Sequence, residues 1–115
     1  MSKQNIALLS LSITAVGAIV ANRFVTPAQD QAVADENTLG VARSNAAGGE
    51  LVTVDVLGTA VVEAGAAISK GATVKSNAAG KAITWATSGA KVGIALEAAA
   101  GDGSFIEVLL IQNAA

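Results

Sequence analysis

Residues 39–56 read LGVARSNAAGGELVTVDV, and residues 92–110 read VGIALEAAAGDGSFIEVLL. Each stretch begins with a short apolar run, passes through alanine and glycine, and ends with apolar residues at every second position. That alternation is typical of a β-strand with one buried face. The two stretches therefore predict two similar β-hairpins, each with a small-residue turn between its strands. Chance similarity between glycine-punctuated segments is the alternative, and two copies are too few for a solenoid.

Short apolar runs separated by glycine continue along the chain from residue 39 onward. Their spacing of roughly ten residues predicts an all-β fold, mainly β with at most one short helix, arranged as a β-sandwich or barrel with an extended N-terminal arm. Residues 28–37 are the candidate for that helix or for a loop, because their apolar face is too thin for a core helix. The predicted strands are residues 39–42, 51–57, 60–63, 72–75, 82–87, 91–96 and 105–111.

The N-terminal segment, residues 6–21, carries no charge and follows Lys3. This outline fits a secretory signal, but polar side chains stand at every second position between residues 9 and 14, which indicates a strand instead. We expect an arm that pairs with the edge of a sheet and buries its apolar face against a partner. That face, a candidate protein interface, consists of Leu9, Leu11 and Ile13. The predicted organisation is an N-terminal arm and strand, residues 1–25, followed by a β-rich domain, residues 26–115.

The last strand of each repeat differs on its outward face. In the first repeat this face carries Thr53 and Asp55, which water solvates at little cost. In the second repeat the residues around Glu107 are apolar, so that strand is apolar on both sides. Such a strand lies either in the centre of a two-layer core or under a partner subunit. In the second case the interface residues are Phe105, Leu109 and Ile111.

The composition removes most catalytic chemistry. Among 115 residues there is no His and no Cys, so the usual general base, thiolate nucleophile and zinc ligands are missing. Lys70 precedes Gly71 in an order that does not match a phosphate loop, and the adjacent carboxylates Asp35 and Glu36 point apart. We therefore predict no catalytic residue, no cofactor and no metal site. The net charge of −2 and the scattered basic residues argue against a nucleic-acid partner, and no apolar run is long enough to indicate a membrane span.

Trp85 is the only tryptophan of the chain. A side chain of this size can anchor an interface or fill the centre of a core made of small residues. We predict the core position, with Ile83 on the same face of its strand.

A succession of glycine-marked segments covers most of the chain and supports a family resemblance. It comprises a turn at residues 64–68, a step at 71–74, Gly80 before a short strand, and the segments 92–96 and 103–110, with 23–25 and 39–42 upstream. In this order the segments resemble the phage capsid cement proteins, which decorate the heads of tailed phages.

The resemblance implies a β-rich structural protein on the outer surface of an assembled phage head. It implies binding to the major capsid protein, stabilisation of the shell, and self-association, with a trimer favoured. It implies no catalytic residue. The alternative from the residues alone is an exported β-domain, a surface or pilus-like subunit whose residues 6–21 are a signal or a donated strand.

Overall fold

The computed structural model describes residues 5–113, which form eight β-strands and no helix. The predicted all-β class is confirmed, and residues 28–37 form a loop. Within residues 5–113 no helix is available to cross a membrane. The strands are β1 (Ala7–Thr14), β2 (Phe24–Val25), β3 (Gly40–Ala42), β4 (Leu51–Glu63), β5 (Thr73–Ser76), β6 (Ala82–Thr84), β7 (Gly93–Ala95) and β8 (Phe105–Leu110).

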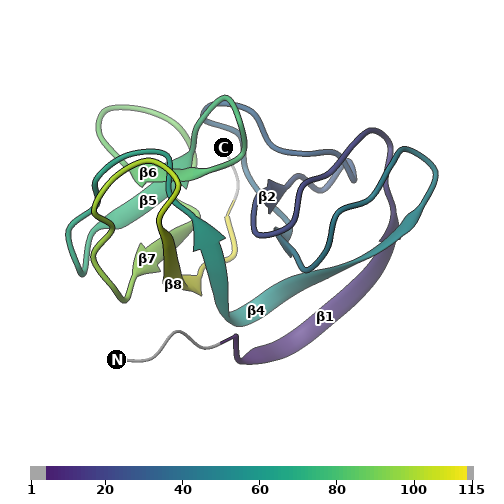
Figure 1. The fold of residues 1–115 in the computed structure, drawn as a ribbon, viewed down its shortest axis with the longest axis horizontal. Helices are drawn as coiled ribbons and strands as arrows, with labels where there is room; N and C mark the ends of the chain where they lie inside the picture. The colour runs from purple at the N-terminus through teal and green to yellow at the C-terminus, as the bar shows by residue number, and fades with distance from the viewer. Residues whose placement is uncertain (1–4, 114–115) are drawn as a thin grey trace.

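The strands form one sheet in the order β2-β3-β4-β8-β7-β5-β6, with β1 paired to β4 as a branch. The first part of β4 pairs with β1 and β3, and its later part pairs with β8. β4 thus crosses from one lobe of the molecule to the other (Figure 1). We call residues 5–57 the first half and residues 58–113 the second half.

β4 replaces two strands that the sequence predicted separately, residues 51–57 and 60–63. Gly58 suggested a break, but it lies inside the strand with a φ of 102°. A side chain at this position would collide with the backbone oxygen of Ile6, so the glycine lets the segment before β1 lie directly on β4.

The two repeats fold as equivalent hairpins, which confirms that prediction. Val41 pairs with Asp55 between β3 and β4, and Ile94 pairs with Leu109 between β7 and β8. The equivalence extends upstream of both repeats. Ile19 exchanges backbone hydrogen bonds with Ala46 as Ile68 does with Ala99, and Ala15 bonds to Gly49 and Glu50 as Ala64 does to Gly103 and Ser104. β1 is therefore the counterpart of the later part of β4.

Each half has its own hydrophobic core, built at equivalent positions. The core of the first half contains Ile13, Ala15, Ile19, Val25, Ala42, Ala46, Val52 and Val54. Their counterparts in the core of the second half are Val62, Ala64, Ile68, Val74, Ala95, Ala99, Ile106 and Val108. Phe24, Ala32 and Val41 of the first half also belong to the second core, so the two halves are packed together.

The N-terminal arm is an integral strand of the chain's own sheet. β1 runs antiparallel to β4 from Thr14 opposite Leu51 to Ala7 opposite Gly58. Residues 6–21, which the alternative reading assigned to a signal, supply Ile13 to the first core. The arm is thus ordered by pairing within its own chain.

The predicted core position of Trp85 is wrong. Its side chain is partly exposed and lies outside both core clusters. The indole Nε1 donates a hydrogen bond to the Gly89 carbonyl oxygen at 2.9 Å, and the Lys91 Nζ lies 4.5 Å from the ring centroid. β6 ends at Thr84, and the Trp85 N–H still donates to the Thr73 oxygen of β5 at 2.8 Å. The Trp85 side chain therefore anchors the surface loop that follows β6.

Candidate binding surfaces

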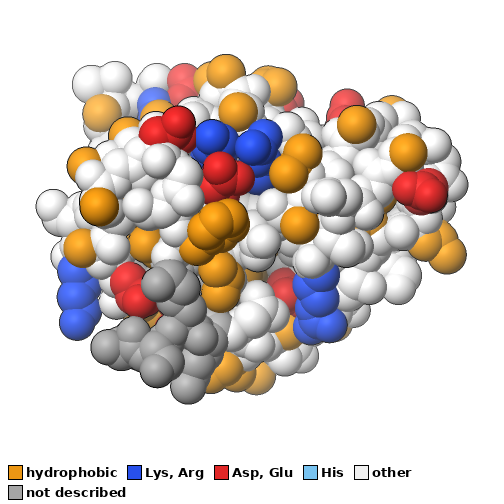
Figure 2. Space-filling model, in the orientation of Figure 1, with side chains coloured by type: hydrophobic (Ala, Val, Ile, Leu, Met, Phe, Trp, Pro, Cys, Tyr) orange, Lys and Arg blue, Asp and Glu red, His pale blue; other side chains and the backbone are white. Residues whose placement is uncertain are grey.

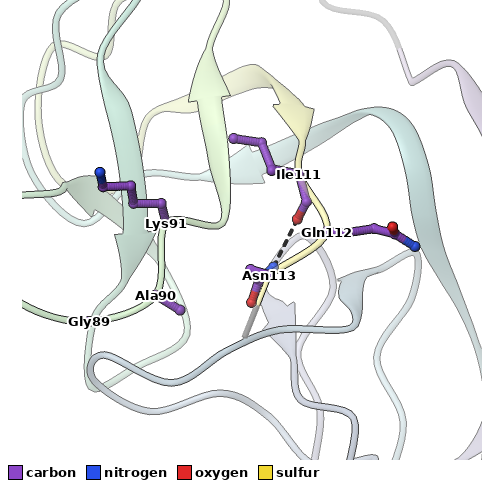
Figure 3. Close-up of a pocket in the computed structure, with 6 residues that line it drawn as sticks. All are labelled: Gly89, Ala90, Lys91, Ile111, Gln112 and Asn113. Atoms are coloured by element: carbon purple, nitrogen blue, oxygen red, sulfur yellow. Dashed lines mark hydrogen bonds between the residues drawn. The ribbon is translucent and has the colours of Figure 1, made fainter. Parts of the chain in front are cut away.

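The hollows on the surface offer little for catalysis. One surface hollow, of about 420 Å³, is lined by Gly89, Ala90, Lys91, Ile111, Gln112 and Asn113 (Figure 3). Its one charged group, Lys91, lies over the ring of Trp85, and the Asn113 amide donates to the Ile111 carbonyl oxygen at 2.8 Å. The lining contains no carboxylate and no hydroxyl, and within residues 5–113 no cluster of acidic residues could hold a metal ion.

The predicted interface residues of the C-terminal strand form an exposed apolar row. Phe105, Leu109 and Ile111 are 43%, 40% and 37% exposed, and we call them the apolar face of β8. β8 is central in the sheet, between β4 and β7, and the alternating Ile106 and Val108 on its other side are fully packed. The central position of this strand is confirmed, because one side is in the core. The position under a partner subunit stays a prediction, which the exposure of the three apolar side chains allows. Figure 2 shows hydrophobic side chains gathered over β4 and β8 near the middle of the molecule.

Glu107 stands on the same side of β8 but is only 1% exposed. Its backbone N–H donates to Glu97 Oε1 at 2.8 Å, and its own Oε1 has no hydrogen-bond partner within residues 5–113. The sequence placed this residue correctly on the outward side, but its burial was not foreseen.

A network of four charged side chains borders the apolar face. Glu63, which pairs across the strands with Phe105, accepts from Arg23 Nε at 3.2 Å and lies 3.3 Å from Lys81 Nζ. Lys81 Nζ also donates to Asp102 Oδ1 at 2.9 Å. The hydrogen bonds to Asp102 and then to Glu63 raise the pKa of Lys81 above its usual value. The charges are visible as a blue and red group above the apolar side chains in Figure 2.

The equivalent surface of the first half is polar. Asp55 occupies the position that Leu109 has in the second half, as the matching pairs Ser10–Asp55 and Thr59–Leu109 show. Asp55 is 1% exposed, so the prediction that water solvates it is wrong. Its carboxylate accepts from Asn5 Nδ2 at 2.7 Å, Ser10 Oγ at 2.8 Å and Arg43 Nε at 3.1 Å.

The pKa of Asp55 reflects two opposing effects. Burial raises it, and the hydrogen bonds from Arg43, Asn5 and Ser10 together outweigh that effect. The net result is a pKa below the ordinary aspartate value. The first half therefore closes its outward surface with an ionised, fully bonded carboxylate, whereas the second half leaves its own surface apolar.

The predicted interface residues of the arm divide into two kinds. Leu9 and Leu11 are 42% and 39% exposed, whereas Ile13 is buried in the first core. All three residues lie on β1, which pairs with one edge of β4, whereas β8 pairs with the other edge. Sequence reasoning missed the most exposed leucine, Leu8 at 79%, because it falls outside the alternating pattern. It also missed the charged network, whose members come from four separate segments.

Comparison with known proteins identifies relatives of this fold. A family model described as phage cement protein matches residues 3–110. The head fiber gp8.5 N base in bacteriophage phi29 has a similar structure, with a TM-score of 0.75 and 20% sequence identity over 93% of this chain and 97% of that chain. At that identity the likeness concerns the fold alone. No curated protein matches the sequence.

Proposed function

The chain belongs to the family of phage cement proteins, and we therefore propose that it binds the outer surface of an assembled phage head and stabilises the shell. As a member of that family it is a structural protein of the virion, associated with the capsid. The proposed partner is the major capsid protein, and the proposed contact is the apolar face of β8. The observation that supports this most is the exposure of Phe105, Leu109 and Ile111 on a strand whose other side is tightly packed.

The surroundings of the apolar face suit a protein–protein contact. Interfaces commonly combine an apolar centre with a polar rim. Here the Arg23–Glu63–Lys81–Asp102 network lies beside Phe105, and its charges are already paired with one another. When a partner excludes water from this surface, charges that are already paired keep their partners. Unpaired charges would instead lose their hydration without compensation.

Stabilisation of the shell follows from mass action. A ligand that binds the assembled lattice and not its separated subunits shifts the equilibrium toward the lattice. Many identical copies on one head would add small individual contributions. Self-association, with a trimer favoured by the family resemblance, would present several apolar faces together and raise the effective affinity.

The test is binding to purified heads that lack this protein. Heads are mixed with increasing amounts of the chain and sedimented, and the bound copies per major capsid subunit are measured. We expect saturation at a fixed ratio and a rise in the temperature at which the heads release their genome. Binding without any rise in that temperature would leave decoration standing and refute stabilisation.

A double variant, Phe105→Ser with Leu109→Ser, tests the proposed contact. Burying the exposed parts of these two side chains contributes about 3 kcal/mol at about 25 cal/mol per Å², so we expect roughly 100-fold weaker binding to heads. Val33→Ser is the matched control, because Val33 is 51% exposed but lies in a loop of the first half. Equal loss in both variants, or no loss in the double variant, would show that the contact is elsewhere.

A further inference from the structure

Among residues 5–113, β1 has a strand partner on one edge only. The N–H of Ala15 donates to the Glu50 oxygen at 2.8 Å, and the Ala15 oxygen accepts from the Gly49 N–H at 2.7 Å, so both groups of Ala15 point toward β4. Backbone groups alternate between the two edges of a strand, so those of Ile13 and Leu11 point the same way. The groups that point away from β4 belong to Ser10, Ser12 and Thr14, and within residues 5–113 no strand pairs with them.

The equivalent edge in the second half is closed. There the later part of β4 takes the place of β1, and its free edge faces the start of the chain. The Thr59 N–H donates to the Ile6 oxygen at 2.9 Å, and the Glu63 N–H donates to the Asn22 oxygen at 2.8 Å. The repeated architecture thus contains two such edges, of which one is filled by this chain and the other is open.

The remaining sheet ends of the described chain are closed except for one residue of β6. At β2, Phe24 donates to Gly80 and accepts from Ala32, at 2.8 and 2.9 Å. At β6, Ala82 accepts from Gly65 at 2.8 Å, and only Thr84 has no backbone partner on the outer edge. A ring of subunits joined edge to edge needs two different open edges on each subunit, whereas residues 5–113 offer one that is longer than a single residue. Edge pairing between copies can therefore join only β1 to β1.

We propose that β1 pairs antiparallel with β1 of a second copy of this chain, about a two-fold axis at Ser12. The axis is placed there because Ser12 is the middle of the segment Ser10–Thr14, which pairs with β4 without a register shift. Ser12 would face Ser12 of the second copy, and Ser10 would face Thr14. The open groups of these residues would form about six hydrogen bonds between the copies.

The side chains of β1 suit this pairing. Across the two-fold axis Leu11 lies opposite Ile13 of the second copy, which would cover a leucine that is 39% exposed in one chain. Open edges are usually protected by charges or proline, yet residues 5–22 contain neither. Self-pairing therefore opposes no like charges. The apolar face of β8 is on the other side of β4 and stays free for the capsid, and a three-fold assembly would have to use a third surface.

Charge substitutions at the axis provide the test. Ser12 is exposed and makes no side-chain hydrogen bond within residues 5–113, so Ser12→Lys, Ser12→Asp and Ser12→Ala should all fold. By sedimentation equilibrium we expect the natural chain and Ser12→Ala to dimerise. Each charged variant should dimerise at least 10-fold more weakly, because a two-fold axis sets each charge against itself. An equimolar mixture of Ser12→Lys and Ser12→Asp should regain the dimer.

A spin-label measurement tests the register independently of affinity. A nitroxide on Ser12→Cys should show strong dipolar broadening, whereas one on Ser69→Cys, an exposed position in the second half, should show none. A natural chain that stays monomeric at about 100 μM would refute the proposal, as would charged variants that dimerise normally. If the chain is monomeric and Ser12→Lys instead loses binding to heads, the open edge takes a strand of the capsid protein and the second copy is ruled out.

Discussion

Replacing Asp55 by asparagine should destabilise the fold strongly for a single isosteric change. The carboxylate is 1% exposed and accepts from Asn5, Ser10 and Arg43. Hydrogen bonds to a charged group contribute about 1.5 to 3 kcal/mol each. The amide keeps one oxygen and replaces the other by a donor, but Arg43 is 49% exposed and water can satisfy it. We therefore expect a loss of about 2 kcal/mol at pH 7, or about 8 °C in Tm for a chain of this length.

The same variant should alter the pH dependence of stability. Because the folded pKa of Asp55 is lowered, the ionised carboxylate stabilises the fold above its unfolded pKa, and this contribution disappears as pH falls through the folded pKa. The Tm difference between the natural chain and Asp55→Asn should thus be constant above about pH 5 and shrink below the ordinary aspartate pKa of about 4. Thermal unfolding followed by circular dichroism at fixed protein concentration measures it. Asp102→Asn, at a carboxylate that is 68% exposed, is the control and should shift stability by less than about 0.5 kcal/mol. Equal Tm values at pH 7, or a difference that persists to pH 2, would refute the reasoning.

Three further changes test the packing. Gly58→Ala should cost more than about 2 kcal/mol in chemical denaturation, because positive φ adds to a backbone collision, whereas Gly71→Ala, also at positive φ but in open space, should cost only about 1 kcal/mol. Val62→Ala, in the fully buried second core, should cost about 2 kcal/mol, and a value near zero would contradict the packing described. Lys91→Met should change the fluorescence of Trp85 while lowering stability by less than about 1 kcal/mol, and an unchanged emission spectrum would show that the cation is not over the ring.

The sequence predicted what depends on local periodicity. Alternation in residues 51–57 and 105–111 identified the buried sides of β4 and β8, and the repeat predicted matching hairpins. It also selected Phe105 and Leu109, which are exposed, and their role as an interface stays a prediction. These features follow from spacing along one strand, which a sequence displays directly.

The errors concern contacts between residues far apart in the chain. Asp55 looked solvated because its partner Asn5 is fifty residues away, and no local pattern reveals that bond. The arm looked like a free strand because its pairing with β4 joins Thr14 to Leu51. Trp85 looked like a core residue because of its size and because the predicted strand covered residues 82–87, whereas β6 ends at Thr84. Comparing the two repeats residue by residue would have placed Asp55 where the second repeat has Leu109.

Because the two halves share β4, the order in which they are translated matters for folding. Every member of the first core lies between Ile13 and Val54, so that core can assemble on the nascent chain before most of the second half has left the ribosome. The second core instead needs Phe24 from the first half and Val108 near the end of the chain. The folded first half therefore holds β4 in an extended conformation, and β8 can pair with it once translation ends.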